Sequence, residues 1–182
     1  QNSIESIVQS PDGYLWFATQ EGLVRFDGTR FTVYDKTNSP EMASHNLTGL
    51  AAGKDGSIFM KPQGNFGFIL LKNGVMKTFR EQDGLLNDNI FDATQDSSGN
   101  VWIGTPSGLS KFNNGTFTNY TRKNGLPCDT VFGIFYSKDG TIWMDGGQQR
   151  VIQFKNETFT VSSGIPGNFI TNFAEDHDGN IW

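Results

Sequence analysis

The chain has 182 residues, of which 36% are hydrophobic, 13% aromatic and 18% charged, and its formal net charge at pH 7 is −5. This aromatic content with a modest net charge argues for a packed core and excludes a disordered chain. The acidic balance argues against nucleic-acid binding, which requires clustered Lys and Arg. No apolar run approaches the roughly 20 residues that a membrane-spanning helix needs.

A repeat of about 42 residues organises the whole sequence. A Gly preceded by a small polar residue recurs at positions 13, 56, 99, 140 and 179. An aliphatic residue stands two positions after each of these glycines, and an aromatic residue follows it. Five matches to one pattern indicate an internal repeat rather than chance. The aromatic residues of this column are Trp16, Phe59, Trp102, Trp143 and Trp182.

Each period contains four short segments rich in β-branched and aromatic residues, separated by Gly, Asn or Asp. No stretch keeps a 3.6-residue period over helical length, so we expect four strands per repeat. In the first period the strands are expected around Ile4 and Ile7, then at 15–16, 22–26 and 31–34. The later third strands are expected at 67–71, 108–112 and 151–154, and the later fourth strands at 75–79, 117–120 and 159–161.

Pairs ending in Gly are expected to supply the positive φ angles of tight hairpin turns. One such pair follows the first strand of each repeat. Between the third and fourth strands the pairs are Asp27-Gly28, Asn73-Gly74 and Asn114-Gly115.

Four short antiparallel strands per 42-residue period predict an all-β fold, a β-propeller with four-stranded blades. The aromatic column is expected to fill the space between neighbouring blades, because one sheet cannot bury both of its faces. The chain holds four repeats and half of a fifth, so we expect a partial ring cut from a longer propeller. A four-bladed ring with a spare half blade is the alternative. The expected blades are approximately residues 3–35, 46–80, 89–121 and 130–161, with the start of the next at 169–182.

The segments 4–31 and 100–120 resemble blades of the two-component regulator propeller family, as do the joining loops 83–86 and 124–127. Two blades depart from the Trp-x-Gly-Thr pattern of the family, at 59–62 and 143–146. The resemblance implies an extracytoplasmic sensor region of a bacterial histidine kinase or diguanylate cyclase, on the periplasmic face of the inner membrane. It further implies a transmembrane tether outside this sequence and a carbohydrate-derived ligand.

The patterns for catalysis and metal binding are missing from the sequence. His45 and His177 are the only histidines, and neither has metal-ligand spacing to another His or Cys. Cys128 has no electropositive neighbour in the sequence, so we expect an unreactive loop thiol. We therefore predict no catalytic residue, no metal site and no cofactor in this chain.

One set of polar residues recurs just before the first strand of each repeat. If that strand is innermost, as in similar propellers, these residues ring a mouth of the central channel, beside Phe91, Phe132 and Phe169. Amides and carboxylates there would suit a hydroxyl-rich ligand; alternatively, they only bond loop backbone amides. His45 and Phe169 depart from the column and are the expected specific contacts. The candidate ligand-binding residues are His45, Asn46, Asp88, Asn89, Asp129, Thr130, Asn168 and Phe169.

Three functions remain open at this point. The first is a ligand-sensing propeller of a bacterial receptor, which binds a small carbohydrate-like molecule and signals through an output domain outside this sequence. The second is a propeller enzyme of lyase or glycosidase type, with Asp88 and Asp129 flanking a scissile bond. The third is a protein-interaction ring. The expected partner is a small molecule, an oligosaccharide by class. We expect no nucleic-acid partner and no insertion of the propeller itself into the membrane. Homodimerisation of the full-length receptor stays open.

Overall fold

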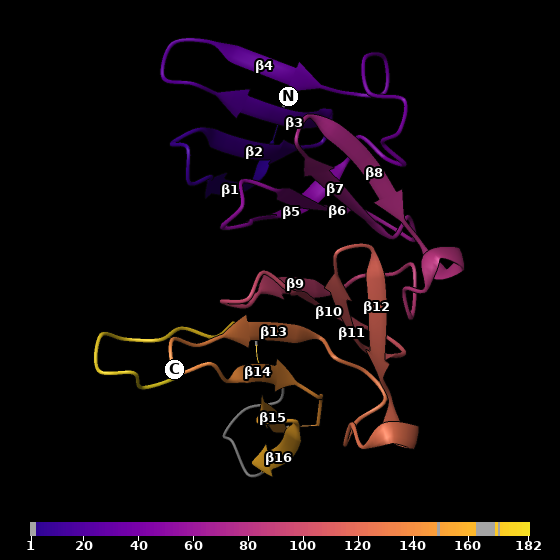
Figure 1. Ribbon diagram of the computed structural model, residues 1–182, viewed down its shortest axis with the longest axis vertical. Coiled ribbons are helices and arrows are strands. Elements are labelled where there is room, and N and C mark those ends of the chain that lie inside the picture. Colours follow the sequence, from indigo (N-terminus) through magenta and orange to yellow (C-terminus); the bar gives the residue numbers. More distant parts are fainter. Residues whose placement is uncertain (1–2, 149, 163–169, 171) are drawn as a thin grey trace. The chain divides into compact units, whose positions relative to one another are not determined.

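The computed structural model describes residues 3–148, 150–162, 170 and 172–182. In these ranges it contains four antiparallel sheets of four strands each, and within every sheet the strands follow one another in chain order (Figure 1). The expectation of four-stranded antiparallel blades in an all-β chain is confirmed. Blades 1 and 2 belong to one compact unit, residues 1–89, and blades 3 and 4 to a second, residues 90–182.

The strands of the first unit are β1 (Ile4–Gln9), β2 (Leu15–Thr19), β3 (Gly22–Phe26) and β4 (Phe31–Tyr34), then β5 (Leu47–Ala52), β6 (Ile58–Pro62), β7 (Phe68–Lys72) and β8 (Val75–Phe79). Those of the second unit are β9 (Asp92–Gln95), β10 (Val101–Thr105), β11 (Gly108–Asn113) and β12 (Thr116–Tyr120), then β13 (Gly133–Tyr136), β14 (Ile142–Asp145), β15 (Val151–Lys155) and β16 (Thr158–Ser162). An isolated bridge between Glu175 and Ile181 follows.

Two of the predicted hairpin turns form as expected. In Asn73-Gly74 and Asn114-Gly115 both residues have positive φ, the geometry of a two-residue turn that matches the strand twist. The turn at Asp27-Gly28 is different, because residues 27–30 form a longer loop. There the Asp27 carboxylate accepts hydrogen bonds from the backbone N–H groups of Thr29 and Arg30. The turn after each first strand is a five-residue loop rather than a tight hairpin, as at 10–14, but its Gly has the predicted positive φ, 89° for Gly13.

That five-residue loop also holds the aromatic column in place. The Trp16 indole N–H donates to Ser10 Oγ at 2.9 Å, and the Trp102 indole N–H donates to Asp96 Oδ2 at 2.8 Å. Blade 2 has Phe59 in this column, and the position of the acceptor is occupied by Gly53. A side-chain acceptor therefore stands at this loop position where the aromatic residue is Trp, whose indole N–H needs a hydrogen-bond partner, and is missing where the residue is Phe. The other such pairs are Trp143 with Ser137 and Trp182 with Asp176.

We expect Ser10→Ala to lower the free energy of unfolding by about 1 to 2 kcal/mol, because it leaves the buried indole N–H of Trp16 without an acceptor. In a Trp16→Phe background, where the ring has no N–H as in Phe59 of blade 2, the same substitution should cost under about 0.5 kcal/mol. Urea denaturation of the four proteins measures this coupling. An equal cost of Ser10→Ala in both backgrounds would show that the hydrogen bond contributes nothing.

Each unit has its own core between its two blades. In the first unit Trp16 packs with residues of blade 2, and in the second unit Trp102 packs with residues of blade 4. Trp16 is 5% exposed and Trp102 3% exposed, so these two residues of the aromatic column lie between blades, as expected. Backbone–side-chain bonds also join neighbouring first strands: Leu50 N–H donates to Ser6 Oγ, and Ile134 N–H donates to Asp92 Oδ2.

Candidate functional site

The loops that carry the candidate residues share one architecture in blades 2 and 3. A short 3-10 turn, η1 (Glu81–Asp83) or η2 (Arg122–Asn124), follows the fourth strand. A left-handed Gly at position 84 or 125 ends each turn, with φ of 105° and 101°. The next residue, Leu85 or Leu126, is buried. This apolar anchor fixes the polar residues that follow it.

In the first unit, the loop between β6 and β7 links the candidate residues of two blades. The Asn46 side-chain amide donates to Gln63 Oε1, and the Gln63 N–H donates to the Asn46 carbonyl at 2.8 Å. Asn65 in the same loop forms a β-bridge with Asn89. Asn46 and Asn89 are thus brought to the same end of blade 2. His45 is exposed beside Asn46.

Asp88 is held by its own loop. Its Oδ1 accepts from the Glu81 N–H at 2.7 Å, and its N–H donates to Glu81 Oε1 at 3.1 Å. Its carbonyl accepts from the Gly67 N–H at 2.9 Å. The Asp88 carboxylate therefore accepts a backbone N–H of its own loop, the alternative that the sequence left open, and its Oδ2 lies 4.0 Å from Arg80 Nη1.

In the second unit, Asp129 and Thr130 make different contacts. Arg122 Nε donates to Asp129 Oδ1 at 2.5 Å, and this hydrogen bond raises the pKa of the Arg122 guanidinium. Thr130 Oγ1 donates to the Pro106 carbonyl at 3.1 Å, which ties the loop to the turn between β10 and β11. The Asp129 pair is exposed to solvent, where such pairs contribute little to stability.

The remaining candidates, Asn168 and Phe169, lie outside the described residues. Asp88 and Asp129 belong to different units. Each carboxylate already has a partner in its own loop, Asp88 with Glu81 N–H and Asp129 with Arg122.

Two aromatic side chains stand where the candidate loops enter the first strands of blades 3 and 4. The rings of Phe91 and Phe132 stack, with centroids 5.2 Å apart and planes 22° from parallel. The Phe91 N–H donates to the Gly104 carbonyl, and the Phe132 N–H donates to the Asp145 carbonyl. Phe132 is 47% exposed. The stacked pair therefore offers a fixed, partly open aromatic surface beside Thr130.

Sequence reasoning missed the residues that support this surface. Asp145 is buried at the end of β14, and its Oδ1 accepts from the Gly147 N–H at 2.7 Å. Arg150 Nη1 donates to the Pro127 carbonyl across the same end of blade 4. The departure of 143–146 from Trp-x-Gly-Thr was the available signal, because it places a carboxylate where a Gly is usual. Cys128 is buried in this loop, and burial raises the pKa of its thiol to about 11.

The arrangement suits stacking and hydrogen bonding. Within residues 3–148, 150–162, 170 and 172–182, no group of three or more His, Cys, Asp or Glu side chains is placed to hold a metal ion. In the same ranges, no helix has the length and apolar character to cross a membrane.

A family model described as two component regulator propeller matches residues 1–21, 84–107 and 164–182. These three matched segments agree with the resemblance to that family that the sequence shows. A comparison with curated protein sequences finds no significant match.

Solved structures with the same fold include two informative ones. The extracellular domain of the putative hybrid two component system BT3049 from B. thetaiotaomicron is 23% identical with a TM-score of 0.81, over 100% of this chain and 27% of that chain. Virginiamycin B lyase from Staphylococcus aureus is 14% identical with a TM-score of 0.75, over 98% of this chain and 62% of that chain. At these identities the likeness shows the fold alone, a β-propeller, of which this chain spans only part.

Proposed function

We propose that this chain is the ligand-sensing propeller region of a bacterial two-component receptor, that it lies outside the cytoplasm, and that it binds a small carbohydrate-like molecule. The family match at residues 1–21, 84–107 and 164–182 supports the receptor class. The extracellular domain of a hybrid two component system among the structures of this fold supports the location.

The observation that carries the ligand class is the stacked pair of Phe91 and Phe132. A partly exposed aromatic face can cover the apolar face of a sugar ring, while polar groups around it orient the hydroxyls. Thr130 precedes Phe132 by two residues. The Thr130 hydroxyl donates to the Pro106 carbonyl and the Phe132 N–H donates to the Asp145 carbonyl, so both residues are held before a ligand arrives. A rigid site of this kind loses little conformational entropy on binding.

Signalling requires two arrangements of the propeller and the output region that follows it in the receptor. A ligand biases their equilibrium only through a difference in its affinity for the two. We infer that the enzyme alternative is weaker, because Asp88 and Asp129 each bond a group in their own loop. A bound sugar would displace water from Phe132 rather than approach a paired acid and base.

Calorimetric titration of the 182-residue chain with a panel of oligosaccharides tests this proposal. We expect at least one to bind, and Phe132→Ala to weaken that binding by about tenfold or more. Phe31→Ala is the matched control, because Phe31 is also an exposed phenylalanine, 66% exposed on the outer strand β4. Binding that is unchanged in Phe132→Ala, or a panel without any binder, would contradict the proposal; turnover of the sugar would favour the enzyme.

A further inference from the structure

The two contacts between complete blades, blade 1 with blade 2 and blade 3 with blade 4, use the same aromatic pair. In blade 1 the rings of Trp16 and Tyr34 stack with centroids 6.0 Å apart and planes at 28°. In blade 3 the rings of Trp102 and Tyr120 stack at 5.8 Å and 24°. One side of each contact is therefore nearly identical, and any difference in the space between the blades arises from the blade that follows.

The following blade differs at two paired positions. Phe154 and Phe159 face each other on β15 and β16 of blade 4. Phe154 lies 5.3 Å from the Trp102 ring and 5.4 Å from the Tyr120 ring, and Phe159 lies 5.8 Å from the Tyr120 ring. The aromatic rings fill this contact, and burial, with a smaller contribution from the Glu157 charge, raises the pKa of Tyr120.

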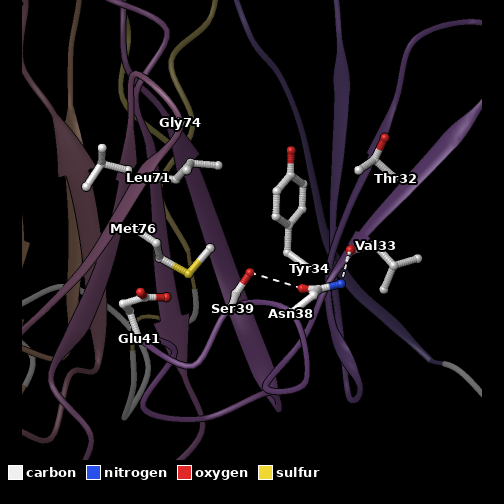
Figure 2. A pocket seen from close by; sticks show the side chains of 10 residues that line it. Thr32, Val33, Tyr34, Asn38, Ser39, Glu41, Leu71, Gly74 and Met76 are labelled. Carbon is white, nitrogen blue, oxygen red and sulfur yellow. Dashed lines mark hydrogen bonds between the residues drawn. The ribbon is translucent and has the colours of Figure 1, made fainter.

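Blade 2 carries Leu71 and Met76 at these same paired positions. Neither side chain has a ring to place against Tyr34, and a cavity of about 480 Å³ opens between β4 and the β7–β8 hairpin. Figure 2 shows the Tyr34 ring facing this space, with Leu71 and Met76 across from it. The cavity thus lies where the second unit holds phenylalanine rings.

The polar wall of the cavity is a well-fixed loop. The Asn38 side chain donates to the Val33 carbonyl and accepts from Ser39 Oγ (Figure 2). The Glu41 carbonyl accepts from Thr78 Oγ1 at 2.7 Å, which ties the loop to blade 2. Since these bonds already exist, the wall needs no reordering to receive a ligand.

Glu41 gives the cavity its charge. It is the one Asp, Glu, Lys, Arg or His among the ten residues that line the cavity, which it shares with Met76 (Figure 2). Among the described residues, Glu41 takes part in none of the ion pairs. A cavity with one apolar wall, formed by Tyr34, Leu71 and Met76, and a carboxylate outside the ion pairs attracts a cation that carries an apolar group.

We propose that this cavity between blades 1 and 2 is a second binding site, separate from the loop site, for small molecules that join an aromatic ring to an ammonium group. The ring occupies the space that Phe154 and Phe159 occupy in the second unit and lies against Tyr34, Leu71 and Met76. The ammonium group pairs with Glu41.

The probe that tests this site is 2-phenylethylamine, observed through the methyl signals of the four methionines in the 182-residue chain. We expect a saturable shift of the Met76 signal, while the signal of Met144, which is buried in the second unit, stays unchanged. The neutral analogue 2-phenylethanol should bind about threefold more weakly. An oligosaccharide that binds the loop site should leave the Met76 signal where it is.

Two variants complete the test. Glu41→Gln should weaken 2-phenylethylamine about threefold and leave 2-phenylethanol unaffected, since only the charge is removed. Met76→Phe should fill the cavity and weaken both probes about tenfold or more. If Met76→Phe does not fold, Glu41→Gln still tests the proposal, because Glu41 is exposed and its replacement should not disturb folding. A Met76 signal that does not respond to 2-phenylethylamine would overturn the proposal. So would a native chain that binds 2-phenylethylamine no more tightly than 2-phenylethanol, with neither affinity changed by Glu41→Gln.

Discussion

Gly67→Ala is expected to lower the free energy of unfolding by more than about 3 kcal/mol. A Cβ atom at this position would lie 2.0 Å from the carbonyl oxygen of Phe79, and this oxygen belongs to the backbone of the paired strand β8. The φ angle of Gly67 is 72°, a conformation that costs an L-residue further energy. Neither β7 nor β8 can move away without breaking the ladder. Urea denaturation followed by circular dichroism measures the loss.

Gly56→Ala is the matched control for this prediction. Gly56 has a similar φ of 79°, and a Cβ there would meet nothing within 4 Å. Its replacement should therefore cost only the conformational strain, about 1 kcal/mol. Gly22→Ala, where the Cβ would lie 2.2 Å from the Tyr34 carbonyl oxygen, should behave like Gly67→Ala. Similar losses for Gly56→Ala and Gly67→Ala would show that the close approach to β8 is not the cause.

Trp102→Ala is expected to cost about 3 to 5 kcal/mol. The ring is 3% exposed, stacks on Tyr120 and touches Phe154 of the next blade. Lys111 Nζ lies 5.0 Å from its centroid, so a cation–π contact is lost as well. Since a domain of this size is stabilised by only about 5 to 15 kcal/mol, the variant should unfold at much lower urea concentration.

Trp182→Ala tests whether the cost comes from burial between blades. Trp182 occupies the same column of the repeat and makes the same indole hydrogen bond, to Asp176, but is 75% exposed. We expect its replacement to change stability by under about 0.5 kcal/mol in the 182-residue chain. If Trp102→Ala were no more costly than Trp182→Ala, the aromatic column would not be the main contact between blades 3 and 4.

The candidate site was predicted from the sequence only in part. The recurrence of polar residues before each first strand marked the loops that lead into these strands, and the sequence placed Phe91 and Phe132 next to them; the structure stacks these two rings. The hydrogen-bond partners of the Asp88 and Asp129 carboxylates could not be predicted from the sequence. Asp88 and Asp129 occupy the same column. Asp88 accepts the Glu81 N–H and lies 4.0 Å from Arg80 Nη1, whereas Asp129 pairs with Arg122. The arginine that pairs with the carboxylate stands eight positions before Asp88 and seven positions before Asp129, so the column alone does not predict the pairing.

The sequence also contains a pattern that predicts the acceptor of each indole N–H. The residue six positions before each aromatic residue of the column is Ser or Asp wherever the aromatic is Trp, and it is Gly53 where the aromatic is Phe59. The hydrogen bonds from the indole N–H groups explain this pairing. A donor buried between blades needs an acceptor, and a phenyl ring has no donor to satisfy.

The amino-acid sequence alone determined the repeat, the four strands of each blade and the aromatic column between blades. These features are local, because side-chain alternation and turn residues act over a few positions and recur with each period. The tertiary structure decided which side chains meet across a blade contact. Leu71 and Met76 look like ordinary strand residues in the sequence, and only their position opposite Tyr34 reveals the cavity. Such contacts join segments about forty residues apart, so strand register and packing between sheets determine them.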